Sequence, residues 1–187
     1  MFNALIVLAP GAEEIEAVTV PDVLVRAGVQ VTIASAGDTT LVRGSRGIPL
    51  GAHTMLDLVR LQTFDLVYLP GGMGSAAICR DDVRIQDLAT TQLAADRLLA
   101  VICAAPIALV PRGLCRGRTL TSYPGVRAQV EPHAGRWLDQ RVVVDGSLIT
   151  SQGAGTALAL ALTLVKVLID PETAAKVANE MIAAAPL

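Results

Sequence analysis

Four short runs of apolar residues, each followed by small or turn-forming residues, dominate the pattern of this chain. They lie at 4–8, 29–34, 66–69 and 98–102. Apolar runs of this length are typical of strands that are buried on both faces. Between them, Glu14–Ala27 and Val83–Arg97 have the apolar spacing of helices. The alternation predicts an α/β fold with a doubly wound parallel sheet and helices on both faces.

Smaller additions to this pattern are also predicted. Glycines and a proline interrupt the apolar residues of Thr39–Leu50, which indicates a small β-hairpin inserted between strand and helix. Pro21 lies inside the first predicted helix and should kink it or shift its start. The other expected elements are a short helix after Cys103, strands at Arg118–Thr121, Arg141–Val144 and Leu148–Thr150, and closing helices at Gly155–Ile169 and Pro171–Ala185. Without a repeat or linker, residues 1–187 are expected to form a single domain.

Composition narrows the classes of function. Hydrophobic residues make up 52% of the 187 residues and only five are aromatic, so the core should be aliphatic. The net charge is −2 with no block of like charge, which disfavours a nucleic-acid or membrane-surface binder. The N-terminal apolar run lacks a basic flank and meets Glu13 directly, unlike a signal peptide, and 157–165 is shorter than a membrane span of roughly 20 residues. We therefore expect a cytoplasmic protein whose partners are small molecules or protein.

The spacing of the cysteines and glycines argues against a metal site and a nucleotide cofactor. Cys79, Cys103 and Cys115 cannot all pair, and no two have the C-x-x-C spacing of a zinc or dithiol site. No G-x-G-x-x-G follows the first strand, so a dinucleotide site is not expected. We predict free thiols and no cofactor or metal.

Cys103 is the main candidate for chemistry. It follows the apolar run 98–102 and precedes small residues and a helical stretch, which is the position of a nucleophile elbow at the carboxyl end of a sheet. A helix N-terminus would favour the thiolate and predicts a pKa well below the reference of about 8.5. A free cysteine is also among the residue types most often buried, so the pattern alone leaves function and packing open.

Two further features lie at the ends of predicted strands. Gly71 and Gly72 would let a loop approach a ligand closely and offer backbone N–H donors, although a Pro-Gly-Gly turn is common. Glu16 lies in the first turn of the first helix, where an acidic residue often does no more than stabilise the helix by interacting with its dipole. If its side chain points inward, burial would raise its pKa and make it a proton donor. The histidines His53 and His133 are expected in exposed loops rather than as catalytic bases.

Several motifs together resemble the ThiJ/PfpI superfamily. These are Ala9-Pro10-Gly11-Ala12-Glu13-Glu14-Ile15-Glu16, Leu69-Pro70-Gly71-Gly72, Ala100-Val101-Ile102-Cys103-Ala104-Ala105-Pro106 and Thr150-Ser151-Gln152-Gly153-Ala154-Gly155-Thr156. Their order and spacing are similar nearly end to end, especially to the branch of the Parkinsonism-associated protein deglycase and bacterial YajL. The resemblance implies a flavodoxin-like homodimer in which Cys103 is an oxidation-sensitive nucleophile beside Glu16.

The resemblance also implies roles for other positions. Backbone N–H groups of Gly72 and Ala104 would face the reacting oxygen, and Arg46 would approach the partner subunit's pocket. Gly71, Tyr123 and Gly153 are further expected substrate-binding positions. Family activities include a glutathione-independent glyoxalase, a protein deglycase and a redox-dependent chaperone.

Departures from the family pattern exclude some activities. Some members have a histidine in the stretch that is Ser122-Tyr123-Pro124 here, so Glu16 would handle proton transfer alone. Peptidase activity is not expected, because Ala104 stands where the protease-like branch has a histidine. Glutamine amidotransferase activity is not expected either, because it needs a late His-x-Glu that this chain lacks. Ala154 stands where several relatives have proline. We expect a cofactor-free cysteine enzyme acting on small α-oxoaldehydes or their early adducts, with a non-catalytic redox sensor or chaperone as the alternative.

Overall fold

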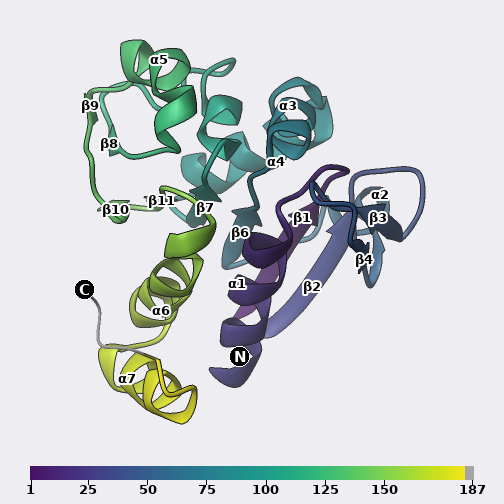
Figure 1. The fold of residues 1–187 in the computed structure, drawn as a ribbon, viewed down its shortest axis with the longest axis vertical. Helices are drawn as coiled ribbons and strands as arrows, with labels where there is room; N and C mark the ends of the chain where they lie inside the picture. Colours follow the sequence, from purple (N-terminus) through teal and green to yellow (C-terminus); the bar gives the residue numbers. More distant parts are fainter. Residues whose placement is uncertain (184–187) are drawn as a thin grey trace.

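A computed structural model describes residues 1–183, and its centre is a seven-stranded sheet in the order β10-β11-β7-β6-β1-β2-β5 (Figure 1). Every neighbouring pair is parallel except β10 with β11. The inner order β2-β1-β6-β7-β11 is that of flavodoxin-like sheets, which confirms the predicted fold class. The strands are β1 (Asn3–Leu8), β2 (Gln30–Ser35), β5 (Thr54–Met55), β6 (Leu66–Leu69), β7 (Leu98–Ile102), β10 (Val142–Asp145) and β11 (Leu148–Ser151).

Helices cover both faces of the sheet because its central strands are apolar on both sides. In β1, Ala4 and Ile6 pack with α1 (Glu14–Arg26), α6 (Ala157–Leu168) and α7 (Pro171–Glu180). The alternate residues Leu5 and Val7 pack on the other face, with α3 (Met73–Asp81), α4 (Val83–Ala94) and the 3₁₀ helix η1 (Ala105–Leu109). This alternation follows from the two-residue period of a strand.

Shorter elements decorate the sheet. The predicted hairpin is present as the antiparallel pair β3 (Leu41–Arg43) and β4 (Pro49–Gly51). The strands β8 (Thr119–Leu120) and β9 (Arg136–Trp137) form a separate parallel pair. The remaining short helices are α2 (Leu56–Val59), α5 (Arg127–Val130), η2 (Pro124–Val126), η3 (Glu131–His133) and η4 (Ala154–Thr156).

Some predicted boundaries are wrong. Pro21 lies inside α1, whose start is not shifted because the Glu13 side chain caps it by accepting from Glu16 N at 2.9 Å. Helix α4 ends at Ala94 rather than Arg97, and β8 is shorter than predicted. Helix α7 ends at Glu180, and Ile182 has φ +53, a left-handed conformation that does not continue a helix. The last predicted positions of that helix, 184 and 185, lie outside the described residues.

The topology brings three segments together at one edge of the sheet. The loops that follow β1, β6 and β7 all leave from the carboxyl ends of parallel neighbours, which is where ligands of open α/β sheets bind. These loops lead to Glu16, to Gly71 and to Cys103.

Candidate active site

Cys103 lies in a strained turn directly after β7. Its φ is +61, in the left-handed region that residues other than glycine rarely adopt. Its backbone N–H donates to Ser151 O at 2.9 Å, and its carbonyl accepts from Tyr123 N at 2.8 Å. These hydrogen bonds hold the turn on two sides, so the thiol faces a cleft, as in a nucleophile elbow.

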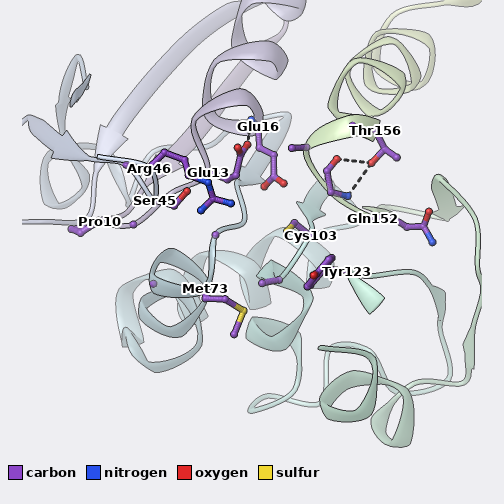
Figure 2. A pocket seen from close by; sticks show the side chains of 18 of the residues that line it. Pro10, Glu13, Glu16, Ser45, Arg46, Met73, Cys103, Tyr123, Gln152 and Thr156 are labelled. Carbon is purple, nitrogen blue, oxygen red and sulfur yellow. Dashed lines mark hydrogen bonds between the residues drawn. The ribbon is translucent and has the colours of Figure 1, made fainter. Parts of the chain in front are cut away.

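Glu16 points inward, toward Cys103 (Figure 2). It is the third residue of α1 and is fully buried. Its Oε2 accepts from Gly71 N at 2.8 Å, whereas its buried Oε1 has no protein hydrogen-bond partner among residues 1–183. Beneath it, the Tyr68 hydroxyl donates to the Glu16 carbonyl at 3.2 Å. The Glu16 side chain therefore faces inward, and its place in the first turn of α1 is not explained by the helix dipole alone.

The glycine pair after β6 lets the backbone approach both reactive side chains. A Cβ on Gly71 would lie 2.5 Å from Cys103 Cβ and 2.7 Å from Glu16 Oε2, closer than real side chains come. Gly72 has φ +88, and a Cβ there would meet the carbonyl of Gly11. The loop therefore lies directly against Cys103 and Glu16, and only glycine fits at either position.

The pKa values of Glu16 and Cys103 are coupled. Burial raises the pKa of Glu16 from 4.5 to about 7, against the hydrogen bond from Gly71, and the charge of Glu13 adds to the rise. Burial also raises the pKa of Cys103, to about 12, and the negative charge of Glu16 adds to it. The backbone N–H groups of Gly72 and Ala104 act in the opposite direction. Above about pH 7 the pair thus holds one negative charge and one proton.

The prediction of a raised Glu16 pKa is confirmed, but the prediction of a low Cys103 pKa is wrong. The helix that follows Cys103 is the five-residue 3₁₀ helix η1, whose dipole is small. Desolvation and the adjacent carboxylate outweigh it. Burial and the neighbouring Glu16 therefore favour the protonated form of the Cys103 thiol.

A cleft of about 970 Å³ opens over this pair. Of the predicted site residues, it is lined by Glu16, Arg46, Gly72, Cys103, Ala104, Tyr123 and Gly153, with Gly71 behind them holding Glu16. The cleft is also lined by residues that the sequence did not single out as site residues: Glu13, Arg43, Met73, Gln152 and Thr156. Glu13, Gln152 and Thr156 lie within the motifs quoted above, so their motif membership was a usable signal.

The hairpin side of the cleft is held by Glu14. Its carboxylate accepts from Ser45 Oγ at 3.0 Å, from Arg46 N at 2.6 Å and from Ile48 N at 3.4 Å. Although burial opposes them, these bonds hold the pKa of Glu14 below its ordinary value. Gly44 allows this contact, because a Cβ there would meet the Glu14 carboxylate. Arg46 is thereby fixed at the rim, facing Glu13 in Figure 2.

Neither histidine lies in the cleft. His53 accepts from Ile33 N at 3.1 Å through Nδ1, and His133 is exposed in η3.

Cys79, Cys103 and Cys115 are free thiols, and burial raises the pKa of Cys79 to about 12. Among residues 1–183, no three His, Cys, Asp or Glu side chains gather closely enough to hold a metal. In the same range, no helix is both long and apolar enough to span a membrane.

Comparison with known proteins identifies the family. The model of the DJ-1/PfpI family matches residues 3–167. The chain belongs to the DJ-1/PfpI family. It is 40% identical to protein dj-1beta of Drosophila melanogaster over 97% of both chains. The crystal structure of that protein superposes with a TM-score of 0.95 at 39% identity, covering 98% of this chain and 99% of the other.

Two further relatives have names that describe their chemistry or redox state. The chain is 37% identical to the glutathione-independent glyoxalase DJR-1.2 of Caenorhabditis elegans, over 91% of this chain and 90% of the other. A Toxoplasma gondii DJ-1 structure described as oxidized has a TM-score of 0.94 and 36% identity, covering 99% of this chain and all of the other. The resemblance that the motifs indicated is therefore confirmed at the level of the DJ-1/PfpI family.

Tyr123→Phe is expected to keep most of any activity at this site. The backbone of Tyr123 is fixed to Cys103, and its half-exposed side chain lines the cleft. Its hydroxyl makes no hydrogen bond to another described residue, so the ring alone should shape the site. Steady-state turnover checks this expectation. A loss of more than roughly a hundredfold, the scale of general acid–base catalysis, would give the hydroxyl a chemical role.

Proposed function

We propose that this chain is a cysteine-dependent, cofactor-free enzyme that converts small α-oxoaldehydes such as methylglyoxal, or their early thiol and amine adducts, into 2-hydroxy acids. The observation that supports it most is the pairing of a thiol at a strained elbow with a buried carboxylate whose pKa is about 7. Membership of a family that includes a glutathione-independent glyoxalase points to the same reaction class.

The first step forms a hemithioacetal. Ionised Glu16 takes the proton of the Cys103 thiol as Sγ attacks the aldehyde carbon, and the proton passes to the aldehyde oxygen. While that oxygen bears negative charge, the backbone N–H groups of Gly72 and Ala104 stabilise it. The raised pKa of Glu16 suits this role, since a base is most effective when its pKa is near the working pH.

The second step moves a proton between neighbouring carbons. Glu16, again ionised, removes the proton from the carbon bonded to sulfur, while the hydroxyl proton on that carbon passes to the neighbouring ketone oxygen, and an enediolate forms. Protonated Glu16 then returns its proton to the adjacent carbon, and the enediolate becomes a thioester of the 2-hydroxy acid. Water then cleaves the C–S bond, which releases the acid and restores the Cys103 thiol, so the net reaction is addition of one water to the oxoaldehyde.

The test is turnover of methylglyoxal by the wild type and by Cys103→Ser, with Cys79→Ser as the control for a buried thiol away from the cleft. We expect the wild type and Cys79→Ser to form lactate and Cys103→Ser to form none above background. Turnover by Cys103→Ser equal to that of the wild type would contradict the proposal.

A redox sensor or redox-regulated chaperone is the second candidate. It is favoured by the environment of the thiol, because backbone N–H groups of Gly72 and Ala104 act on the sulfur and Glu16 Oε1 has no hydrogen-bond partner among residues 1–183. The two N–H groups can donate to a sulfinate on Cys103, and so can Glu16 in its protonated form, which its raised pKa favours. A protein with no methylglyoxal turnover that gains two oxygen atoms on Cys103 under mild peroxide would support this alternative.

We also propose a homodimer that uses the outer surface of α1. Ile15, Val18 and Val25 on α1 are more than half exposed, as are Leu41 and Ile48 of the neighbouring hairpin. A groove of about 370 Å³ runs between α1, β2 and β4. Exposed apolar residues that gather on one surface are typical of protein interfaces. Because the hairpin also holds Arg46, such an interface would lie next to the candidate active site.

Light scattering is expected to give twice the monomer mass of 19.4 kDa at micromolar concentration. Val18→Glu should shift the protein toward the monomer, because dimerisation would bury the new charge. Val83→Glu, at an equally exposed position on α4 across the sheet, is the matched control and should remain dimeric. A wild-type mass of 19.4 kDa would contradict the proposed dimer.

A further inference from the structure

A second polar cleft shares no lining residue with the cleft over Cys103. It has a volume of about 640 Å³ and is bounded by the turns of 110–117 and by 132–134. Arg112, Arg116 and His133 line it together with Pro111 and Pro132, and none of its lining residues is acidic. In Figure 1 this region lies near α5 and β8, on the opposite side from the hairpin β3–β4.

The charge of Arg116 at this cleft is not neutralised by a neighbouring acidic side chain among residues 1–183, whereas Arg112 forms an ion pair with Asp87. Arg116 is exposed and makes no side-chain hydrogen bond or ion pair with another residue of 1–183. Arg112 donates one N–H to Asp87 at 2.9 Å, which leaves other donors of its guanidinium free. The neighbouring acid Glu131 already accepts from two guanidinium nitrogens of Arg127, at 2.7 and 2.8 Å. The cleft is therefore positively charged.

The sequence shows that this charge is local. Residues 111–141 contain six arginines and two acidic residues, whereas the rest of the chain has nine basic and fifteen acidic residues. A protein of net charge −2 thus has one locally basic segment, of which Arg112 and Arg116 line the cleft. Because the acidic remainder would repel a long polyanion, the charge distribution favours a small anion over a nucleic acid.

We propose that this cleft binds the phosphate group of a small organic phosphate monoester. Two guanidinium groups supply planar forks of N–H donors that match phosphate oxygens, and His133 adds a ring N–H. The volume exceeds that of a free phosphate ion and lies in the range of small-molecule sites. Pro111 and Pro132 offer apolar surface for the organic part. The site is independent of the α1 surface and of the chemistry at Cys103.

The experiment is calorimetric titration of the full chain with AMP, ribose 5-phosphate and glycerol 3-phosphate, with adenosine and inorganic phosphate as comparison probes. We expect at least one monoester to bind, more tightly than inorganic phosphate, and adenosine to give no heat. Arg116→Gln should weaken the binding about tenfold or more, the scale of a charge-assisted hydrogen bond. Arg136→Gln is the matched control, because Arg136 is also exposed but does not line the cleft.

Four results would overturn the proposal. They are no binding of any monoester at millimolar concentration, equal affinity for inorganic phosphate, equal weakening by Arg136→Gln and Arg116→Gln, and much tighter binding of a single-stranded oligonucleotide. Methylglyoxal turnover of Arg116→Gln should equal that of the wild type, whichever value the wild type has. Both arginines are exposed, so circular dichroism should show the same fold for both variants.

Discussion

Glu16→Gln is expected to lower methylglyoxal turnover by about 10² to 10⁴, the contribution of a general base. Glutamine keeps the oxygen that accepts from Gly71 N, so the loop should stay in place. It has no basic carboxylate, so the Cys103 thiol, with its pKa of about 12, would keep its proton. Glu16→Gln with wild-type turnover would contradict the mechanism.

The pH profile of the wild type provides a second measurement of the same group. The value of kcat/KM should rise with pH, with a midpoint near 7, because Glu16 must be ionised to act as the base. Above that pH it should level off, since the next ionisation of the pair lies near 12. In Glu16→Gln the residual activity should lack this midpoint. A wild-type rate that is flat between pH 5 and pH 8 would exclude Glu16 as the base.

In Glu16→Gln, the free energy of unfolding should rise at pH 8 although the turnover falls. The pKa of Glu16 is raised from 4.5 to about 7 on folding, so the folded state retains a proton that the unfolded chain loses in this interval. The stabilising contribution is present below pH 4.5 and disappears as the pH rises to about 7. At pH 8, Glu16→Gln should therefore be more stable than the wild type by up to about 3 kcal/mol, from 1.36 kcal/mol for each pKa unit. Denaturant unfolding at pH 4 and pH 8 measures the difference, which should vanish at pH 4.

Gly71→Ala is expected to lower turnover by about a hundredfold or more while Cys103 and Glu16 are both still present. The added Cβ would lie 2.5 Å from Cys103 Cβ and 2.7 Å from both Glu16 Oε2 and Ile102 O. One of these groups must move, and a displacement of about 1 Å can cost a hundredfold in rate. Overpacking of this kind should also lower the free energy of unfolding by about 1–3 kcal/mol.

The matched control is Gly51→Ala in β4, where an added Cβ meets no atom within 4 Å. Its turnover and its urea midpoint should remain those of the wild type. Wild-type kinetics in Gly71→Ala would mean that the loop yields without disturbing the pair, and the site would then not depend on this close approach.

The sequence determined the sheet and its main connections. Apolar runs followed by small or turn-forming residues predicted β1, β6 and β7, because strands buried on both faces need apolar side chains along nearly their whole length. The run 29–34 also predicted β2, although this strand starts at exposed Gln30 and is only partly buried as far as Ile33. The glycines and proline of 39–50 predicted the hairpin for an equally local reason. Helix α3 escaped prediction, since its first turn, Met73-Gly74-Ser75, has no strong helix signal and its stability comes from packing against η1.

The orientation and the pKa values of the site residues depend on the tertiary structure and cannot be predicted from local sequence patterns. The sequence indicated Cys103 by its position after a strand, but it did not decide whether Glu16 faces solvent or the thiol. It also gave the wrong direction for the pKa of Cys103, because the dipole of a helix can be inferred from neighbouring residues and desolvation cannot. Burial depends on what β1, β6 and β7 bring around the pair, and that environment raises the pKa of both Glu16 and Cys103.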